Sequence, residues 1–385
     1  FVSKSLSFIS LAVVSALGSG CISVGSDGKL SLVTEESKTP AAEVKKHFLS
    51  VASTPVSPSN ASTTPMISGT LSTEAQAATL IELYSNSTCT TSVGSGTPAS
   101  FTGAGISATA LSNSTMSIYA KASTGGNDVS ACEFLMNYTH DNVVPTVGIS
   151  TIAPSVFNSS YTVNVTFSEP VTGFDLSDVT VSPTGSASSL SGSGTAYSFT
   201  VTPSTEVLVN TSVNISSFTD SAGNSNSAAS NIISITHDIT PPTITNISSG
   251  VVNGTYNIGS IIDVSIAFSE AVTVSGGTPT LTLELGGTDR LASYESGSLS
   301  STLVFKYTVQ SGDNTSDLDY VSTTALALNG ATMKDQINNA TLTLPSPGAS
   351  GSLGNNKAIV IDTSAPTITN VSSNTSNASY TTNAG

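Results

Sequence analysis

The residues best suited to chemistry in this chain of 385 residues are carboxylates at recurrent places. Charged residues make up only 9% of the sequence, whereas soluble domains average about 25%. Hard cations such as calcium need several oxygen ligands brought together, mostly carboxylates and backbone carbonyls. The recurrent acids therefore predict calcium binding. The candidate ligands are Asp141, Glu169, Asp220, Asp238, Glu270, Asp335 and Asp362.

The same acids have a second interpretation, in which they only shape turns and cap strands. Three of them, Asp141, Asp238 and Asp362, stand four residues before a proline, and Asp220 opens the sequence Asp-Ser-Ala-Gly-Asn. Aspartate in such positions favours tight turns through hydrogen bonds from its side chain to the backbone. Both interpretations stay open at this point.

The first twenty residues have the pattern of a secretory signal peptide. Lys4 precedes an apolar stretch over 6–17, which is too short to span a bilayer, and small residues follow at 18–20. Because Cys21 comes directly after them, the stretch resembles the lipobox of bacterial lipoproteins, whose cysteine is acylated after cleavage. The resemblance implies an exported protein, anchored by lipid at Cys21 to the outer membrane at the cell surface.

The alternative is an ordinary signal peptide with an incidental thiol, because lipoboxes usually carry Leu three residues before the cysteine and this chain has Gly18. Residues 21–60 are rich in Ser, Thr and Pro. Such a composition is typical of flexible tethers. We expect this segment to separate the first folded domain from the membrane.

Internal repeats organise the remainder of the chain. The pattern Asp-x-x-x-Pro recurs at 141–145, 238–242 and 362–366, and Phe-Ser-Glu recurs around Glu169 and Glu270. Motifs that recur in the same order along a chain indicate tandem units of one structure. They predict domains at 61–141, 142–238 and 239–362, with the start of a fourth at 363–385.

Within each repeat the apolar residues alternate with polar ones. In the second repeat, Val163, Val165 and Phe167 alternate with Asn164 and Thr166, and the third repeat has the same pattern around residue 264. A period of two is typical of strands that are buried on one face. Short strands separated by Gly, Asn and Ser turns predict antiparallel sheets packed face to face. The predicted fold class is therefore all-β.

These motifs resemble those of bacterial Ig-like domains, which occur in tandem in surface adhesins and large repeat proteins. The resemblance covers residues 61–362 and is carried by the Phe-Ser-Glu strands, the turn at 220–224 and the Asp-x-x-x-Pro junctions. It implies immunoglobulin-like β-sandwiches arranged in a row. In similar tandem domains, calcium at the junctions stiffens the linker.

The order of the acids suggests how two calcium sites would form. Asp141, Glu169, Asp220 and Asp238 would meet at the end of the second domain if junction and turn close on the same pole. The third domain offers Asp238, Glu270, Asp335 and Asp362 in matching order.

Two further cysteines, Cys89 and Cys132, lie inside the first domain. Because export exposes the chain to an oxidising compartment, we expect them to form a disulfide. A loop of this length would stabilise the domain by roughly 4 kcal/mol in the chain-entropy description.

The sequence argues against catalysis and against nucleic-acid binding. His47 lies in the tether, and His140 and His237 each precede a junction aspartate. Neighbours on a strand point to opposite faces, so these pairs are not catalytic dyads. A formal net charge of −15 with ten Lys and Arg leaves no basic surface for phosphates.

We therefore expect a non-catalytic stalk or adhesive module that presents itself to a protein or glycan ligand at a surface. The alternative is that the repeats are the spacer of a larger exported enzyme or carbohydrate-binding protein, whose functional domain lies beyond Gly385. The sequence does not separate these two functions.

Overall fold

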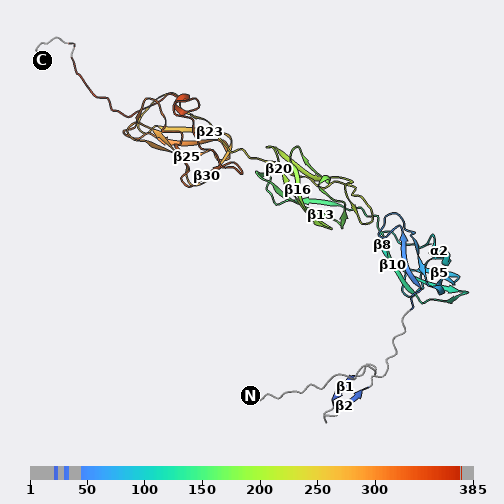
Figure 1. Cartoon of the computed structure of the whole chain (residues 1–385). Helices are drawn as coiled ribbons and strands as arrows, with labels where there is room; N and C mark the ends of the chain where they lie inside the picture. The colour runs from blue at the N-terminus through green and yellow to red at the C-terminus, as the bar shows by residue number, and fades with distance from the viewer. Residues whose placement is uncertain (1–20, 25–29, 34–44, 373, 375–385) are drawn as a thin grey trace, which may run out of the picture. The chain divides into compact units, whose positions relative to one another are not determined.

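The computed structural model describes residues 21–24, 30–33, 45–372 and 374 (Figure 1). The signal peptide predicted over 1–20 lies outside these residues. The chain divides into two compact units, Phe1–Asn142 and Val143–Gly385. Among the described residues, no helix is both long enough and apolar enough to cross a membrane.

The predicted tether contains strands. Cys21 is the first residue of β1 (Cys21–Val24), which pairs antiparallel with β2 (Leu30–Val33). Farther along, β3 (Phe48–Thr54) pairs with β4 (Met66–Leu71). The first sandwich thus begins before residue 61, where the sequence placed its boundary. Because the segment is rich in Ser and Thr, its composition did not indicate strand β3. The buried Phe48 of this strand packs in the core of the first sandwich.

The first sandwich, β3 to β10, has two sheets around one hydrophobic core. One sheet has the order β10-β8-β5-β6, with β9 paired to β8, and the other has the order β3-β4-β7. Figure 1 shows β5, β8 and β10 lying together beside α2. The remaining bounds are β5 (Leu80–Tyr84), β6 (Ser92–Gly96), β7 (Ile106–Ser107), β8 (Ser114–Thr124), β9 (Asn127–Asp128), β10 (Glu133–His140), α1 (Thr73–Gln76) and α2 (Pro98–Thr102).

The second sandwich, β11 to β20, pairs a sheet of order β11-β13-β17-β16 with one of order β12-β20-β18-β15. The predicted alternation is present in β13, where Val163 and Val165 are buried and Asn164 is exposed. A separate small pair, β14 with β19, lies off both sheets. The bounds are β11 (Val147–Ser150), β12 (Val156–Phe157), β13 (Tyr161–Phe167), β14 (Val171–Thr172), η1 (Leu176–Asp178), β15 (Val179–Ser182), β16 (Ser186–Ser193), β17 (Ala196–Thr202), β18 (Leu208–Val213), β19 (Thr219–Asp220) and β20 (Ile233–His237).

The third sandwich, β21 to β31, encloses the largest of the three cores. Its main sheet has the order β21-β23-β26-β25-β24-β28, and its smaller sheet has the order β22-β31-β27. The bounds are β21 (Ile244–Ser249), β22 (Gly254–Tyr256), β23 (Ile261–Gly276), β24 (Thr280–Glu284), β25 (Arg290–Ser296), β26 (Ser300–Thr308), β27 (Asn314–Thr315), β28 (Asp319–Tyr320), β29 (Leu326–Ala327), β30 (Ala331–Lys334), α3 (Leu353–Asn356) and β31 (Ile359–Asp362).

Each sandwich buries its own alternating apolar residues, and the helices are single turns. The predicted all-β class, with sheets packed face to face, is confirmed. The three cores are separate clusters, as expected when repeats fold as individual units.

Candidate cation site at a domain junction

Glu169 and Glu270 are positioned by the same interruption of a strand. In the second sandwich β13 ends at Phe167, and the chain resumes as β14, which pairs with β19. In the third sandwich the pairing of β23 with β26 breaks after Ala267, and the strand continues against β30. In each case the glutamate of Phe-Ser-Glu falls where the chain changes partner, at the rim of the sandwich.

In both sandwiches the new partner strand ends at an aspartate or directly before one. β19 ends at Asp220, and β30 ends at Lys334, directly before Asp335. Asp220 Oδ1 accepts hydrogen bonds from the backbone of Ala222 and Asn224, at 2.8 and 2.9 Å. Asp335 Oδ1 accepts them from Ile337 and Asn338, at 2.5 and 2.6 Å. The acids therefore do shape turns, and the turn brings each beside its glutamate.

In the third sandwich this construction gathers three carboxylates. Oxygen atoms of Asp238, Glu270 and Asp335 lie within 4.8 Å of one another. Asp335 is buried, and the other two are half-buried. Together they line an open hollow of about 290 Å³. Convergent carboxylates of this kind are the usual ligands of calcium.

The electrostatics of the group are repulsive. Burial, followed by the charge of Asp335, raises the pKa of Asp238. Burial and the charges of Asp335 and Asp238 raise the pKa of Glu270. Among the described residues, no Lys or Arg forms an ion pair with any of the three. A bound cation would relieve this repulsion.

Sequence reasoning missed Glu206, a fourth acid near this group. Its charge also raises the pKa of Asp238 and of Glu270. It accepts a hydrogen bond from the hydroxyl of Thr240, two residues after Asp238. Glu206 lies outside every recurrent motif, so no spacing in the sequence points to it.

The other predicted group contains residues of both units. Asp141 belongs to the first unit, whereas Glu169 and Asp220 belong to the second. Within the second unit, carboxylate oxygens of Glu169 and Asp220 lie within 4.8 Å of each other. Asp220 is buried, and its Oδ2 accepts from the Asn224 amide at 2.7 Å. A calcium site completed by Asp141 stays a prediction.

Two predicted members lie in other surroundings. Asp238, expected in both groups, has Glu270 and Asp335 as its carboxylate neighbours. Asp362, expected beside them, is the exposed last residue of β31, where it pairs with Asn314. Its Oδ1 accepts from the backbone N–H of Ser364 at 2.9 Å. It therefore acts here as a turn former.

The buried Asp313, close in sequence to the partner of Asp362, forms an ion pair with an arginine of the same sandwich. Arg290 Nε donates to Asp313 Oδ1 at 2.8 Å, and Tyr307 and the backbone of Gln310 donate to its other oxygen. Burial raises the pKa of Asp313, but the hydrogen bonds from Tyr307 and Arg290 outweigh it and leave that pKa lowered. This carboxylate is already neutralised within the fold.

Cys89 and Cys132 form a disulfide with a Cα–Cα distance of 5.8 Å.

The histidines serve packing and local contacts. His140 and His237 are buried, with Nδ1 facing the Asn113 amide and the Thr205 carbonyl respectively, and His47 faces Glu133.

Residues 141–236 match the family model of a bacterial Ig-like domain. This range spans nearly the whole second sandwich, so the chain contains a bacterial Ig-like domain, as the motifs predicted. No match was found among curated proteins. A bacterial Ig-like domain indicates a structural or surface-associated role, and its sandwich fold is typically non-catalytic.

Proposed function

We propose that this chain is a non-catalytic, load-bearing stalk at a bacterial surface, attached through Cys21 and stiffened by calcium at its junctions. Its role would be to hold a protein- or glycan-binding surface away from the membrane. The observation that carries the proposal is how each sandwich closes. In all three, a segment near the beginning pairs in parallel with the last strand.

In the first sandwich, Ser59 forms a parallel bridge with His140. The Ser59 N–H donates to Thr139 O, and the Asp141 N–H donates to Ser59 O, both at 3.0 Å. In the second sandwich β12 pairs in parallel with β20. In the third, β22 pairs in parallel with β31.

Parallel closure matters because of where tension would enter. When the two ends of a domain are pulled apart, segments that run in the same direction slide along each other. Their hydrogen bonds are then loaded together in shear, whereas an antiparallel hairpin pulled from its open end unzips one bond at a time. Repeated use of this closure favours a stalk under tension.

Single-molecule pulling of the whole chain from its two ends tests the proposal. Ser59→Pro removes the N–H that donates to Thr139 and should lower the unfolding force of the first sandwich while leaving the other two unchanged. Ser59→Ala keeps that N–H and serves as the matched control. Equal unfolding forces for the Pro and Ala variants would show that the parallel closure carries no load.

The calcium part of the proposal is supported by the group of Asp238, Glu270 and Asp335. Extracellular modules bind calcium with Kd values of about 10⁻⁴ to 10⁻³ M. At about 10 mM calcium, such a site would stabilise the third sandwich by roughly 1.4 to 2.7 kcal/mol. Thermal unfolding with calcium and with chelator measures this difference, and coincident curves would remove calcium from the proposal.

A further inference from the structure

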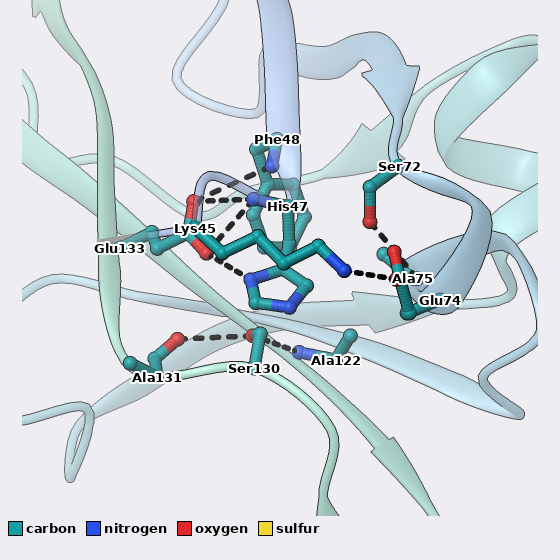
Figure 2. Close-up of polar contacts among 10 residues, drawn as sticks. All are labelled: Lys45, His47, Phe48, Ser72, Glu74, Ala75, Ala122, Ser130, Ala131 and Glu133. Atoms are coloured by element: carbon teal, nitrogen blue, oxygen red, sulfur yellow. Dashed lines mark hydrogen bonds and ion pairs between the residues drawn. The ribbon is translucent and has the colours of Figure 1, made fainter. Parts of the chain in front are cut away.

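We infer that the first sandwich contains a redox-controlled latch, in which the Cys89–Cys132 disulfide holds Glu133 where it grips the segment that enters the domain. Reduction of the disulfide would release that segment without unfolding the sandwich. Figure 2 shows the gripped segment, Lys45 to Phe48, and the carboxylate of Glu133 beside it. The inference does not depend on the stalk bearing load.

The grip is a cluster of hydrogen bonds to one carboxylate. Both oxygens of Glu133 lie 3.1 Å from the backbone nitrogen of His47, and Oε2 lies 3.4 Å from that of Phe48. His47 Nδ1 lies 2.7 Å from Oε1. The side chains of His47 and Glu133 are only 13% and 14% exposed. Hydrogen bonds to a charged acceptor shielded from water are among the stronger ones.

Phe48 connects this grip to the core. Its ring is buried and packs edge-to-face on Phe101 with centroids 5.4 Å apart. One residue earlier, the His47 carbonyl accepts from the Ser72 N–H at 2.8 Å. The carboxylate of Glu133 in β10 therefore accepts from the N–H groups of the entering segment, while the His47 carbonyl accepts from Ser72, directly after β4 in the sheet that contains β3.

Glu133 needs outside support because it is the first residue of β10. Its pairing with Ala120 is the end of the ladder, and a register shift follows between Phe134 and Met136. Strand ends next to irregular pairing open locally at low free energy. The preceding loop is held by the buried Ser130, whose hydroxyl accepts from the Ala122 N–H at 2.9 Å and donates to Ala131 O (Figure 2).

Between Ser130 and Glu133, the disulfide attaches the chain covalently to the neighbouring loop. Cys132 directly precedes Glu133, and its bond reaches Cys89 in the loop after β5. Cys89 is buried, whereas Cys132 is half-buried. With the bond intact, the chain on the N-terminal side of Glu133 cannot move away from the sheet.

A dithiol reductant would open the latch in two balanced steps. Its thiolate attacks Sγ of the more exposed Cys132, which gives a mixed disulfide and releases Cys89 as a thiolate that takes up a proton. The second thiol of the reductant then displaces Cys132 as a thiol and closes the disulfide of the reductant. Two protein thiols and one oxidised dithiol result.

Amide hydrogen exchange on the full chain, oxidised and after treatment with dithiothreitol, tests the latch. On reduction, the His47 and Phe48 amides, which donate to Glu133, should lose at least tenfold more protection than the amides of the β5–β8 ladder, which report the global stability of the domain. Glu133→Ala should produce the same local loss with the disulfide intact. Glu74→Ala removes the exposed ion pair with Lys45 and leaves the Glu133 hydrogen bonds in place, so both amides should stay protected.

Two results would overturn the inference. The first is unchanged protection of His47 and Phe48 after complete reduction, verified by thiol titration. The second is an equal loss of protection at these amides and in the β5–β8 ladder, because the disulfide would then stabilise only the domain as a whole. The Glu133→Ala variant keeps the test decisive, since unchanged protection there excludes the grip regardless of how the reduced protein behaves.

Discussion

The third sandwich holds two acidic clusters that solve the same electrostatic problem differently. Asp313 is fully buried and is neutralised by Arg290 from its own sandwich. Asp238, Glu270 and Asp335 converge where the chain enters the sandwich, and among the described residues no Lys or Arg pairs with them. The first cluster is complete as folded, whereas the second gains from a cation supplied by the solvent. The comparison predicts opposite responses to mutation and to calcium.

The largest effect should come from removing the charge of the complete cluster. Asp313→Asn leaves Arg290 and Tyr307 without their charged acceptor and should destabilise the third sandwich by about 3 kcal/mol. Chemical denaturation measures the loss, which should be the same with calcium and with chelator. Asp317→Asn, at an exposed position nearby, should change stability by less than about 0.5 kcal/mol. Similar losses for the two variants would contradict this assignment.

A smaller effect of the opposite sign is expected in the open cluster. Glu270→Gln removes one of the repelling charges, so without calcium the variant should be at least as stable as the natural chain. It should also lose most of the stabilisation of roughly 1.4 to 2.7 kcal/mol that calcium confers. Thermal melts in calcium and in chelator measure both changes. Glu284→Gln, at an exposed residue of the same sandwich, is the matched control and should keep the full response to calcium.

The smallest effect concerns pH. The raised pKa values of Asp238 and Glu270 mean that the folded protein binds protons at these groups more tightly than the unfolded chain does. Their contribution to stability is therefore full below about pH 4 and is lost as the pH rises through the raised values. In chelator, as the pH rises from about 4 through the raised pKa values, the natural chain should lose more stability than the Glu270→Gln variant. Parallel pH profiles would indicate that the carboxylates do not interact.

Asp313 should behave in the reverse manner, because its pKa is lowered in the folded state. Its stabilising contribution is present above the pKa of the unfolded chain and is lost as the pH falls through the lowered value. Comparing the natural chain with Asp313→Asn at acidic pH isolates this term. The contributions of the two clusters to folding stability therefore change with pH in opposite directions.

The position of the junction acids could be predicted in part from the sequence. Phe-Ser-Glu and the junction aspartate recur, and this recurrence is enough to mark Glu270 and Asp238 as candidate ligands. Asp335 also belonged to the predicted set, and the pairing of β23 with β30 is what places it beside Glu270. Glu206 could not be predicted, because its approach depends on a loop of another sandwich. Asp362 shares the junction motif but lies in β31 beside Asn314, since a motif fixes a turn and not the neighbours of its side chain.

By itself, the sequence determined the all-β class, the tandem repeats and the strands whose alternation is strong. A period of two has one economical outcome, in which one face of each strand is buried. The tertiary structure alone decided that β3 belongs to the first sandwich, that a segment near the beginning of each sandwich pairs in parallel with its last strand, and that Glu133 binds the entering segment. These features depend on pairs of residues far apart in the chain, and local spacing carries no information about which distant residue completes a hydrogen bond or a charge cluster.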